Sequence, residues 1–267
     1  MSTLPTNWKN WVVKNLISGV KSSDILNTLL ENGFTFAVAR KALGKNLPAE
    51  LSHQRNADYY RKLSNPQLIG VKGQYNVRFL EQEKAQLFVI EEFLSFPQCD
   101  EIINIAKSAL KPSEISANSG YEGFRTSTTC DLSIIEHAAV KRLETQIVQC
   151  LGIEVGAKEM MQAQHYAVGQ QFKKHTDYFE PGSEEYKTHA QQRGQRSWTF
   201  MIYLDQSCEG GETEFPHLNL TVTPKKGTAL VWNNLCVDGT PNPLTLHQSL
   251  PIIAGEKTIV TKWFRDR

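Results

Sequence analysis

The stretch QHYAVGQQFKKHTD, residues 164–177, places two short β-type segments on either side of a turn. Residues 161–166 and 172–175 are expected to form strands, and the Ala-Val-Gly sequence between them is a turn signal. The second segment runs directly into an H-x-D pair made by His175 and Asp177. On a regular strand, side chains two residues apart point to the same face, so both groups can reach one ion.

A third candidate ligand, His247, lies 70 residues after Asp177, and Lys257 follows ten residues later. Two imidazoles and one carboxylate suit a ferrous ion and leave three coordination positions open. A nearby lysine suits the free end of a dicarboxylate bound at that metal. An H-x-D pair alone also occurs by chance, and a lone histidine is more often a hydrogen-bonded structural residue than a ligand. The metal site is therefore a hypothesis that the surrounding sequence has to support.

Strand signals dominate the chain from residue 159 onward. The segment WTFMIYL, residues 198–204, is apolar enough to be buried on both faces. Further short strands, separated by turns, are expected at residues 220–222, 229–232, 245–247 and 258–264. Many short strands separated by turns indicate a sandwich or a barrel.

Helical segments precede this run of strands. After an apolar strand at residues 87–90, residues 97–110 carry an apolar stripe, and Pro97 suits the first helical turn. Residues 134–151 predict a second helix, and the residues between the two helices, 111–133, read as a polar loop or hairpin. The fold class is therefore predicted to be α+β, with a double-stranded β-helix (jelly-roll) core and packing helices.

The N-terminal residues 5–44 show apolar residues at helical spacing and predict a small region of short helices. Residues 45–80 are polar and irregular, which predicts a linker. Two domains follow from this pattern, 1–80 and 81–267. The turn at residues 29–34 resembles the Gly-Phe loop of ubiquitin-associated-type three-helix domains, so the helices are interpreted either as a module for a protein partner or as a cap on the main domain.

Composition and charge exclude several classes of protein. The 267 residues are 40% hydrophobic and 21% charged, and the net charge of +1 gives no global field for nucleic acid or membrane. Residues 1–63 hold nine Lys/Arg and four Asp/Glu, a balance of +5. This excess is compatible with an acidic partner or with a solvated basic face.

Targeting and redox signals favour a cytoplasmic protein. Five scattered cysteines without a C-x-x-C spacing predict reduced thiols. The N-terminus lacks the apolar run of a signal peptide, and no segment approaches the length of a transmembrane helix.

Eight sequence blocks occur in order along the second half of the chain. They are Arg125-Thr126-Ser127, Gln164-His165-Tyr166, residues 175–179, residues 199–204, residues 209–216, residues 224–227, Leu246-His247, and Gly255-Glu256-Lys257 with Thr261-Lys262-Trp263. With these blocks, residues 87–265 resemble the catalytic domain of the prolyl 4-hydroxylase-type Fe(II)/2-oxoglutarate dioxygenases. Eight matching blocks in the same order support the H-x-D motif, which would be weak evidence alone.

The resemblance implies roles for the metal-centre residues. His175, Asp177 and His247 would ligate Fe(II), and 2-oxoglutarate would chelate the iron through its 1-carboxylate and 2-keto oxygens, leaving one position for dioxygen. The 5-carboxylate would lie deep in the barrel, where a buried carboxylate needs a charged partner, and Lys257 would supply it. No further catalytic acid, base or nucleophile is required.

The resemblance also implies roles around the metal centre. Tyr166 and Thr199 occupy the family's hydroxyl positions near the cosubstrate, although a core tyrosine and a strand threonine are the alternative interpretations. Arg125 and Ser127 lie in a segment that is near the substrate in relatives, and Trp263 matches an aromatic position near the active site. A solvated loop arginine and a core tryptophan are the competing interpretations.

The implied activity is hydroxylation of a C–H bond, most readily peptidyl-proline 4-hydroxylation, with succinate and carbon dioxide as coproducts and ascorbate as reductant. The substrate would be a protein or a peptide. The sequence departs from the family at His247-Gln248-Ser249, where His-Gly-Gly is frequent, and at Lys257-Thr258, where Lys-Trp is frequent. These departures leave open the same chemistry on another side chain or a small molecule, and a non-catalytic jelly-roll binding module is the third alternative.

Overall fold

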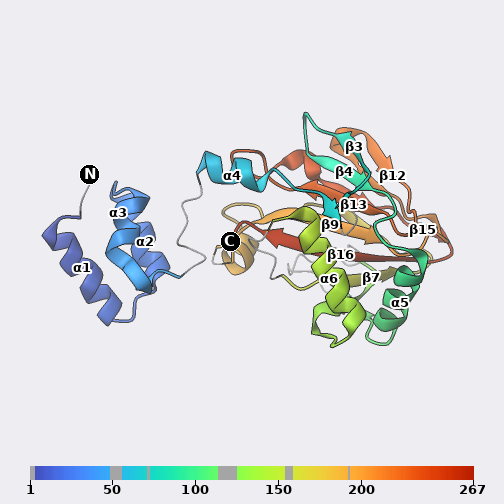
Figure 1. Cartoon of the computed structure of the whole chain (residues 1–267), viewed down its shortest axis with the longest axis horizontal. Helices are drawn as coiled ribbons and strands as arrows, with labels where there is room; N and C mark the ends of the chain where they lie inside the picture. The colour runs from blue at the N-terminus through green and yellow to red at the C-terminus, as the bar shows by residue number, and fades with distance from the viewer. Residues whose placement is uncertain (1–3, 49–55, 71–72, 114–124, 154–158, 192) are drawn as a thin grey trace. The chain divides into compact units, whose positions relative to one another are not determined.

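Two units make up the chain in the computed structural model: residues 1–59, grouped with Arg267, and residues 60–266. The structure describes residues 4–48, 56–70, 73–113, 125–153, 159–191 and 193–267. Figure 1 shows the helices of the first unit in blue and the sheets of the second unit from green to red. Each unit has its own apolar core.

Residues 4–48 of the first unit form three short helices and a closing turn. They are α1 (Thr6–Ile17), α2 (Ser22–Glu31), α3 (Phe36–Leu43) and the 3-10 turn Gly44–Asn46. Apolar residues at helical spacing meet in one core, which includes Ile25, Leu29 and Phe34. The ring of Trp8 packs edge-on against both Trp11 and Phe34, with centroids 5.3 and 5.2 Å away.

The boundary between the units falls between residues 59 and 60, inside the predicted linker 45–80 and before the domain boundary expected at residue 80. Residues 60–80 belong to the second unit, and polar groups in this segment form hydrogen bonds with the rest of that unit. The Tyr60 hydroxyl donates to Asp266 at 2.9 Å, and the indole of Trp198 donates to the Leu63 carbonyl at 2.8 Å. The segment also supplies an edge strand, β3, to the main sheet.

An eight-stranded antiparallel sheet forms the centre of the second unit, with the strand order β3-β4-β13-β9-β16-β7-β6-β5. Its strands are β3 (Val77–Glu81), β4 (Leu87–Ile90), β5 (Lys111–Pro112), β6 (Thr128–Asp131), β7 (Gln162–Tyr166), β9 (Arg196–Tyr203), β13 (Ala229–Asn233) and β16 (Lys257–Arg265). Every residue of β16 is buried, because both of its faces are covered. The prediction of an α+β protein is confirmed at the level of helices combined with antiparallel sheets.

A second antiparallel sheet has the order β12-β11-β14-β8. Its strands are β8 (Phe172–His175), β11 (Thr213–Phe215), β12 (Leu220–Val222) and β14 (His247–Ser249). Two small strand pairs join β1 (Ile69–Gly70) to β2 (Gly73–Gln74) and β10 (Glu209–Gly210) to β15 (Ile252–Ala254). One apolar cluster combines side chains from both large sheets, including Tyr166, Trp232 and Phe215.

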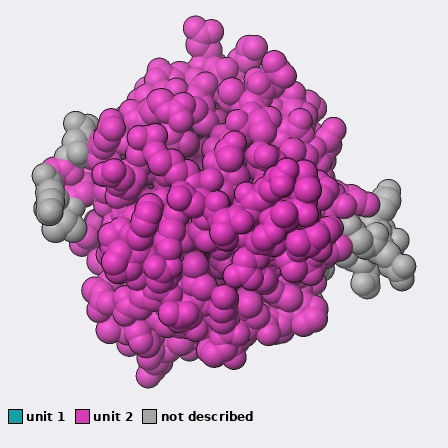
Figure 2. Space-filling view, turned by 90° about the vertical axis from the view of Figure 1, so that its right-hand side faces the viewer, with its two compact units in different colours: residues 1–59, 267 teal, residues 60–266 magenta. Residues whose placement is uncertain are grey.

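Helices α5 (Phe96–Lys107) and α6 (Ala138–Leu151) accompany the main sheet, and α4 (Ala57–Leu63) spans the boundary between the units (Figure 1). Ser95 and Gln98 form a capping box at the start of α5, which fixes its first turn. Lys262 of β16 reaches Glu144 on α6, so this face of the sheet is turned away from the core cluster. Viewed from the side, residues 60–266 form one continuous body (Figure 2).

Three local predictions were wrong, each because of a turn. The helix expected from residue 134 begins at Ala138, since residues 132–134 form a 3-10 turn and the His137 ring caps the helix. The strand expected at 245–247 begins at His247, because Asn242 caps a 3-10 turn that ends at Thr245. The expected loop 178–196 contains a π-helical turn at Tyr186–Ala190.

The expected polar segment 111–133 is only partly within the described residues. In the expected polar segment 111–133, strand β6 occupies Thr128–Asp131, and residues 114–124 lie outside the described part. Within the described segments, no helix combines the length and the apolarity needed to cross a membrane.

Candidate metal centre

The two candidate histidine ligands come from neighbouring strands of the small sheet. His247 of β14 and His175 of β8 are register partners, so their side chains leave the sheet side by side. Their ring centroids are 4.3 Å apart. The 72 residues that separate the two histidines in sequence (247 − 175) are therefore bridged by one antiparallel strand pair.

Asp177 completes the cluster just beyond the end of β8. Its Oδ2 lies 4.0 Å from His247 Nε2, and one ligand atom from each of His175, Asp177 and His247 lies within 4.8 Å of the others. Both His247 and Asp177 are buried, and His175 is half-buried. One carboxylate and two imidazoles at these separations can bind a divalent metal ion on one face.

Hydrogen bonds to the backbone set the orientation of both rings. His175 Nδ1 lies 2.7 Å from the Lys173 carbonyl, and His247 Nδ1 lies 2.9 Å from the Thr245 carbonyl. A carbonyl can only accept, so each Nδ1 carries a proton, and Nε2 is the ring nitrogen left for a metal. Backbone carbonyls of this kind are the usual outer partners of metal-binding histidines.

The protonation states suit metal binding. Burial, with the adjacent His247 ring, lowers the pKa of His175 to about 3, so this imidazole is neutral near pH 7. Burial alone would raise the pKa of Asp177, but His247, His175, Arg196 and the Thr199 hydroxyl together hold it below its usual value. A neutral imidazole and an ionised carboxylate are the forms that coordinate metals.

A hydrogen-bonded chain fixes the Asp177 carboxylate. Asn234 Nδ2 donates to Thr199 Oγ1 at 2.9 Å, and the Thr199 hydroxyl donates to Asp177 Oδ2 at 2.6 Å. Thr199 is fully buried on β9 but does not line the cavity that contains the three candidate ligands. The structure therefore places Thr199 against the carboxylate and gives it a positioning contact, where the resemblance implied a contact with the cosubstrate.

Replacing Thr199 with valine should weaken metal binding by roughly 10- to 100-fold, the usual loss when an outer partner of a ligand is removed. The methyl group keeps the volume but donates no hydrogen bond to Asp177. Iron titration of the purified variant measures the loss. Thr228→Val is the matched control, because Thr228 is also buried and its hydroxyl has no hydrogen-bond partner among the described residues. Equal affinities in both variants would remove the positioning role.

A second, half-buried group holds the backbone of Asp177. Arg196 Nη1 donates to the Asp177 carbonyl at 3.4 Å, and its guanidinium lies 4.1 Å from the centroid of the Trp263 ring. Glu159 accepts three hydrogen bonds from Arg196 and one from Arg265, which lowers the Glu159 pKa despite its burial. Sequence reasoning missed Arg196, because its partner Glu159 lies 37 residues away and no motif joins the two.

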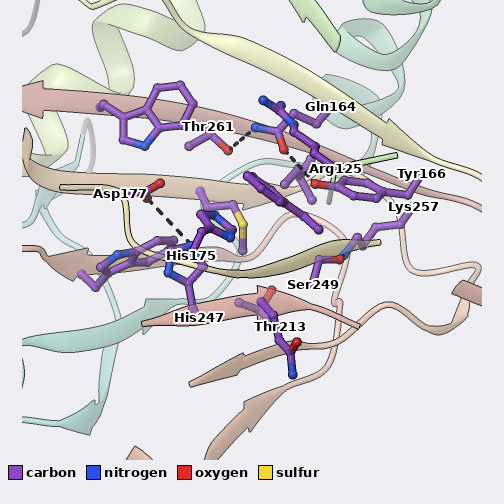
Figure 3. A pocket seen from close by; sticks show the side chains of 16 residues that line it. Arg125, Gln164, Tyr166, His175, Asp177, Thr213, His247, Ser249, Lys257 and Thr261 are labelled. Atoms are coloured by element: carbon purple, nitrogen blue, oxygen red, sulfur yellow. Dashed lines mark hydrogen bonds and ion pairs between the residues drawn. The ribbon is translucent and has the colours of Figure 1, made fainter. Parts of the chain in front are cut away.

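A cavity extends from the metal cluster between the two sheets. Strand β16 contributes every second residue to its lining, at Lys257, Ile259, Thr261 and Trp263. In Figure 3 the Asp177, His175 and His247 side chains lie on one side of this cavity, and Lys257 and Ser249 lie on the other. The remaining lining residues are Arg125, Gln164, Tyr166, Phe172, Met201, Thr213, Trp232 and Gln248.

Lys257 is a buried cation, with only 1% of its surface exposed. Its ammonium donates to the Gly211 carbonyl at 2.6 Å and to Ser249 Oγ at 2.5 Å, and it lies 4.6 Å from the centroid of the Tyr166 ring. None of the carboxylates in the described part of the chain forms an ion pair with it. Burial lowers the pKa of Lys257 to about 8, against smaller raising effects of Cys208, Asp205 and Glu212.

Gly211 makes the close approach to Lys257 feasible. Its φ of +72° is in the left-handed region, and an added Cβ would lie 2.3 Å from Ile252 Cδ1 and 3.4 Å from Lys257 Cδ. The sequence predicts only a turn glycine here. The structure adds a second reason for glycine, since its carbonyl is one of two acceptors for the buried ammonium.

A polar wall joins β7 to β16. The Tyr166 hydroxyl donates to Gln164 Oε1 at 2.9 Å, and Gln164 Nε2 donates to Thr261 Oγ1 at 3.3 Å. Gln164 and Thr261 stand in the sequence blocks but were given no role from the sequence. The alternation of strand faces could have identified both, since they lie two and four residues from Tyr166 and Lys257 respectively.

Arg125 and Ser127 flank this wall. The Arg125 guanidinium donates to Thr129 Oγ1 at 3.1 Å and lies 5.0 Å from the centroid of the Phe172 ring, and Arg125 lines the cavity. Ser127 is buried, shares a 2.9 Å hydrogen bond with Ser113 and does not line the cavity. The structure thus brings Arg125, Trp263, Tyr166, Lys257 and the three candidate ligands to one cavity, and leaves Thr199 and Ser127 just behind it.

Comparisons with known proteins agree with this arrangement. Residues 161–265 match the family model described as "2OG-Fe(II) oxygenase superfamily". The chain is 32% identical over 205 residues to "Probable prolyl 4-hydroxylase 4" of Arabidopsis thaliana, covering 67% of each protein. It is 30% identical over 195 residues to human "Prolyl 4-hydroxylase subunit alpha-1", but these residues span only 36% of that subunit.

Solved structures give the same result. The viral collagen prolyl hydroxylase of Paramecium Bursaria Chlorella virus-1, in its 2OG complex, superposes with a TM-score of 0.54 at 28% identity, covering 67% of this chain and 95% of that one. The relatives, the fold and the His175, Asp177 and His247 cluster agree. The chain therefore belongs to the prolyl 4-hydroxylase family of Fe(II)- and 2-oxoglutarate-dependent oxygenases.

Proposed function

We propose that this chain is a peptidyl-proline 4-hydroxylase whose iron is bound by His175, Asp177 and His247 on a double-stranded β-helix core. The donor set fits Fe(II), since two imidazoles and one carboxylate on one face leave positions for two further ligands and dioxygen. The two opposed antiparallel sheets support the assignment of the core. The two backbone-anchored rings and the fixed carboxylate mean that the ligands are held before metal arrives.

The buried ammonium of Lys257 is the observation that carries the cosubstrate assignment. An ammonium without a carboxylate partner is costly to bury, and an anionic ligand in the same cavity would offset that cost. We assign this ligand as the 5-carboxylate of 2-oxoglutarate, with Lys257 and Ser249 as its partners. The opposite end of the cavity then presents the ligand cluster to the 1-carboxylate and keto group.

The metal centre, when loaded, supplies oxygen activation coupled to decarboxylation of 2-oxoglutarate. The chain itself binds, orients and excludes water. Apolar lining residues such as Ile259, Met201 and Trp232 keep the cavity dry between its two charged ends. Thr199 and Arg196 hold Asp177 in place from behind. No protein acid or base is required for hydrogen abstraction.

A peptide substrate fits the lining of the cavity near the ligand cluster. Arg125 offers guanidinium donors that suit peptide carbonyls, and Trp263 offers an aromatic face of the kind that packs against a proline ring. Gln248 stands beside the cavity where relatives frequently have glycine, so this side chain is a candidate selector among peptides. Ascorbate is proposed as the reductant that restores ferrous iron after uncoupled turnover.

The test is succinate formation by the full chain with Fe(II), 2-oxoglutarate and ascorbate, with and without proline-containing peptides. Peptide-stimulated succinate, together with a product heavier by one oxygen atom on proline, would support the proposal. Stimulation by a small molecule, or oxygen on a different side chain, would keep the chemistry and replace the substrate. No succinate from iron-loaded protein would favour the non-catalytic binding module.

The value of kcat/KM for 2-oxoglutarate should fall as the pH rises through about 8. The Lys257 ammonium is charged below its pKa of about 8 and neutral above it, so the attraction for the 5-carboxylate is lost on the alkaline side. Initial rates measured from about 1.5 pH units below that pKa to about 1.5 pH units above it give the profile. Lys257→Arg is the control, because its guanidinium stays charged throughout this range. An identical alkaline loss in both proteins would assign the ionisation elsewhere.

A further inference from the structure

An apolar groove lies between α1 and α3 in the unit formed by residues 1–59. Its volume is about 400 Å³. The buried side chains of Leu4 and Val12 contribute to its lining, together with Val13 of α1 and Val38 and Ala42 of α3. A hollow of this size can accept several aliphatic side chains at once.

The apolar surface continues beyond the groove along α1. Val13 is 54% exposed, and Ile17, one helical turn further on, is 81% exposed. Helix α1 therefore has two apolar sides, because Trp8 and Val12 already pack into the core of this unit. A contiguous exposed apolar surface of this kind marks an interaction site more often than scattered single residues do.

The charges around the groove have one sign. Lys9 of α1 and Lys41 of α3 are exposed and line it. Helices α1 and α3 contain Lys9, Lys14, Arg40 and Lys41 and no acidic residue, whereas Asp24 and Glu31 both belong to α2. The face that carries the groove is therefore basic, and it favours a partner with acidic groups.

The two helices that form the walls are held in place by the core of this unit. The Trp8 ring on α1 packs edge-on against Phe34, which is buried just before α3 begins. The Thr35 hydroxyl accepts a hydrogen bond from the Val38 amide and caps α3. A groove that is already formed costs little ordering when a ligand binds.

We propose that this groove binds an acidic amphipathic helix of another protein, with apolar side chains in the hollow and carboxylates at Lys9 and Lys41. Helix α1 has 12 residues. Its length of about 18 Å matches a partner helix of three turns, which presents apolar residues at positions i, i+3 or i+4, and i+7. The concave shape favours inserted side chains over a membrane surface, and a second copy would bring two basic faces together.

The probe is a synthetic 18-residue helix (about five turns) with leucine along one stripe and glutamate elsewhere. A matched peptide carries lysine in place of every glutamate. Calorimetric titration of the full chain should show saturable binding of the glutamate peptide only. Amide NMR shifts should concentrate at Val13, Val38 and Ala42.

Charge reversal at the rim, Lys9→Glu with Lys41→Glu, should weaken this binding by at least about tenfold, and Val13→Glu should do the same by blocking the hollow. Lys14→Glu with Lys21→Glu is the matched control, since it changes the net charge equally at residues that do not line the groove. Succinate formation by every variant should be that of the unmodified chain, which reports an intact oxygenase unit.

Three results would overturn the proposal. The control pair, at Lys14 and Lys21, could weaken binding as much as the rim pair, at Lys9 and Lys41. The loss would then come from the net charge of the unit and not from contacts at the groove. The chain could dimerise with concentration in a manner abolished by Val13→Glu, which would make a second copy the occupant. Vesicles of phosphatidylserine and phosphatidylcholine could bind through Lys9 and Lys41 while the glutamate peptide does not, which would make a lipid surface the partner.

Discussion

Replacing Asp177 with alanine should reduce iron-dependent succinate formation by ~10³-fold or more, because the metal supplies several kcal/mol and each 1.4 kcal/mol is a tenfold change in rate. Asp177 is the only carboxylate among the three clustered ligand atoms. Without it, the cluster keeps two imidazoles but has no anionic ligand to attract Fe(II). Succinate production and iron content after desalting measure the two parts of this loss.

The control for this variant is Thr176→Ala, in the same segment. The Thr176 hydroxyl bonds to the Tyr178 carbonyl at 3.2 Å and does not line the cavity. We expect it to retain iron and most of the activity. Both variants should keep the far-UV circular dichroism of the unmodified chain. Full activity of Asp177→Ala, or an equal loss in both variants, would reject the assignment of Asp177 as a ligand.

The metal cluster could be predicted from the sequence because strand geometry is regular. His175 and Asp177 stand two residues apart at the end of a strand, and the ordered sequence blocks selected His247 from the remaining histidines. The resemblance to a known family, rather than spacing, supplied the pairing of His247 with His175. The structure shows the reason for that pairing as one register position of an antiparallel ladder.

The groups behind the cluster could not be predicted, because their contacts are long-range. Asn234 reaches Thr199 across 35 residues, and Glu159 reaches Arg196 across 37. Neither pair has a spacing that a local rule recognises. The same limit explains the unit boundary, since long-range bonds show that residues after 59 pack on the oxygenase unit, such as the one from Tyr60 to Asp266, 206 residues away.

The elements with strong local signals were predicted best. Pro97 and the apolar stripe after it predicted the helix that the structure shows as α5, and the apolar runs at 87–90 and 229–232 are confirmed as β4 and β13. Errors arose where a turn competes with a regular element. At Asn242 the side chain accepts a hydrogen bond from the Leu244 amide and starts a 3-10 turn in a segment that its threonine and leucine content favours as a strand.

Replacing Lys257 with methionine should raise the KM for 2-oxoglutarate by roughly 30- to 3,000-fold, since removing one partner of a buried charge pair costs about 2–5 kcal/mol. Methionine keeps the length and apolar character of the side chain but carries no charge. The metal cluster is at the other end of the cavity, so kcat at saturating 2-oxoglutarate should change much less than KM. Steady-state succinate assays with Lys225→Met, an exposed lysine, as control measure both constants.

A cosubstrate without the distal carboxylate separates the loss of this ion pair from a general distortion. 2-Oxopentanoate offers the same 1-carboxylate and keto group but nothing for Lys257 to bind. The unmodified chain should therefore prefer 2-oxoglutarate strongly, and Lys257→Met should lose most of that preference because only the distal contact differs. If the variant weakens both cosubstrates equally, Lys257 acts through the packing of Tyr166 and Gly211, and the 5-carboxylate has another partner.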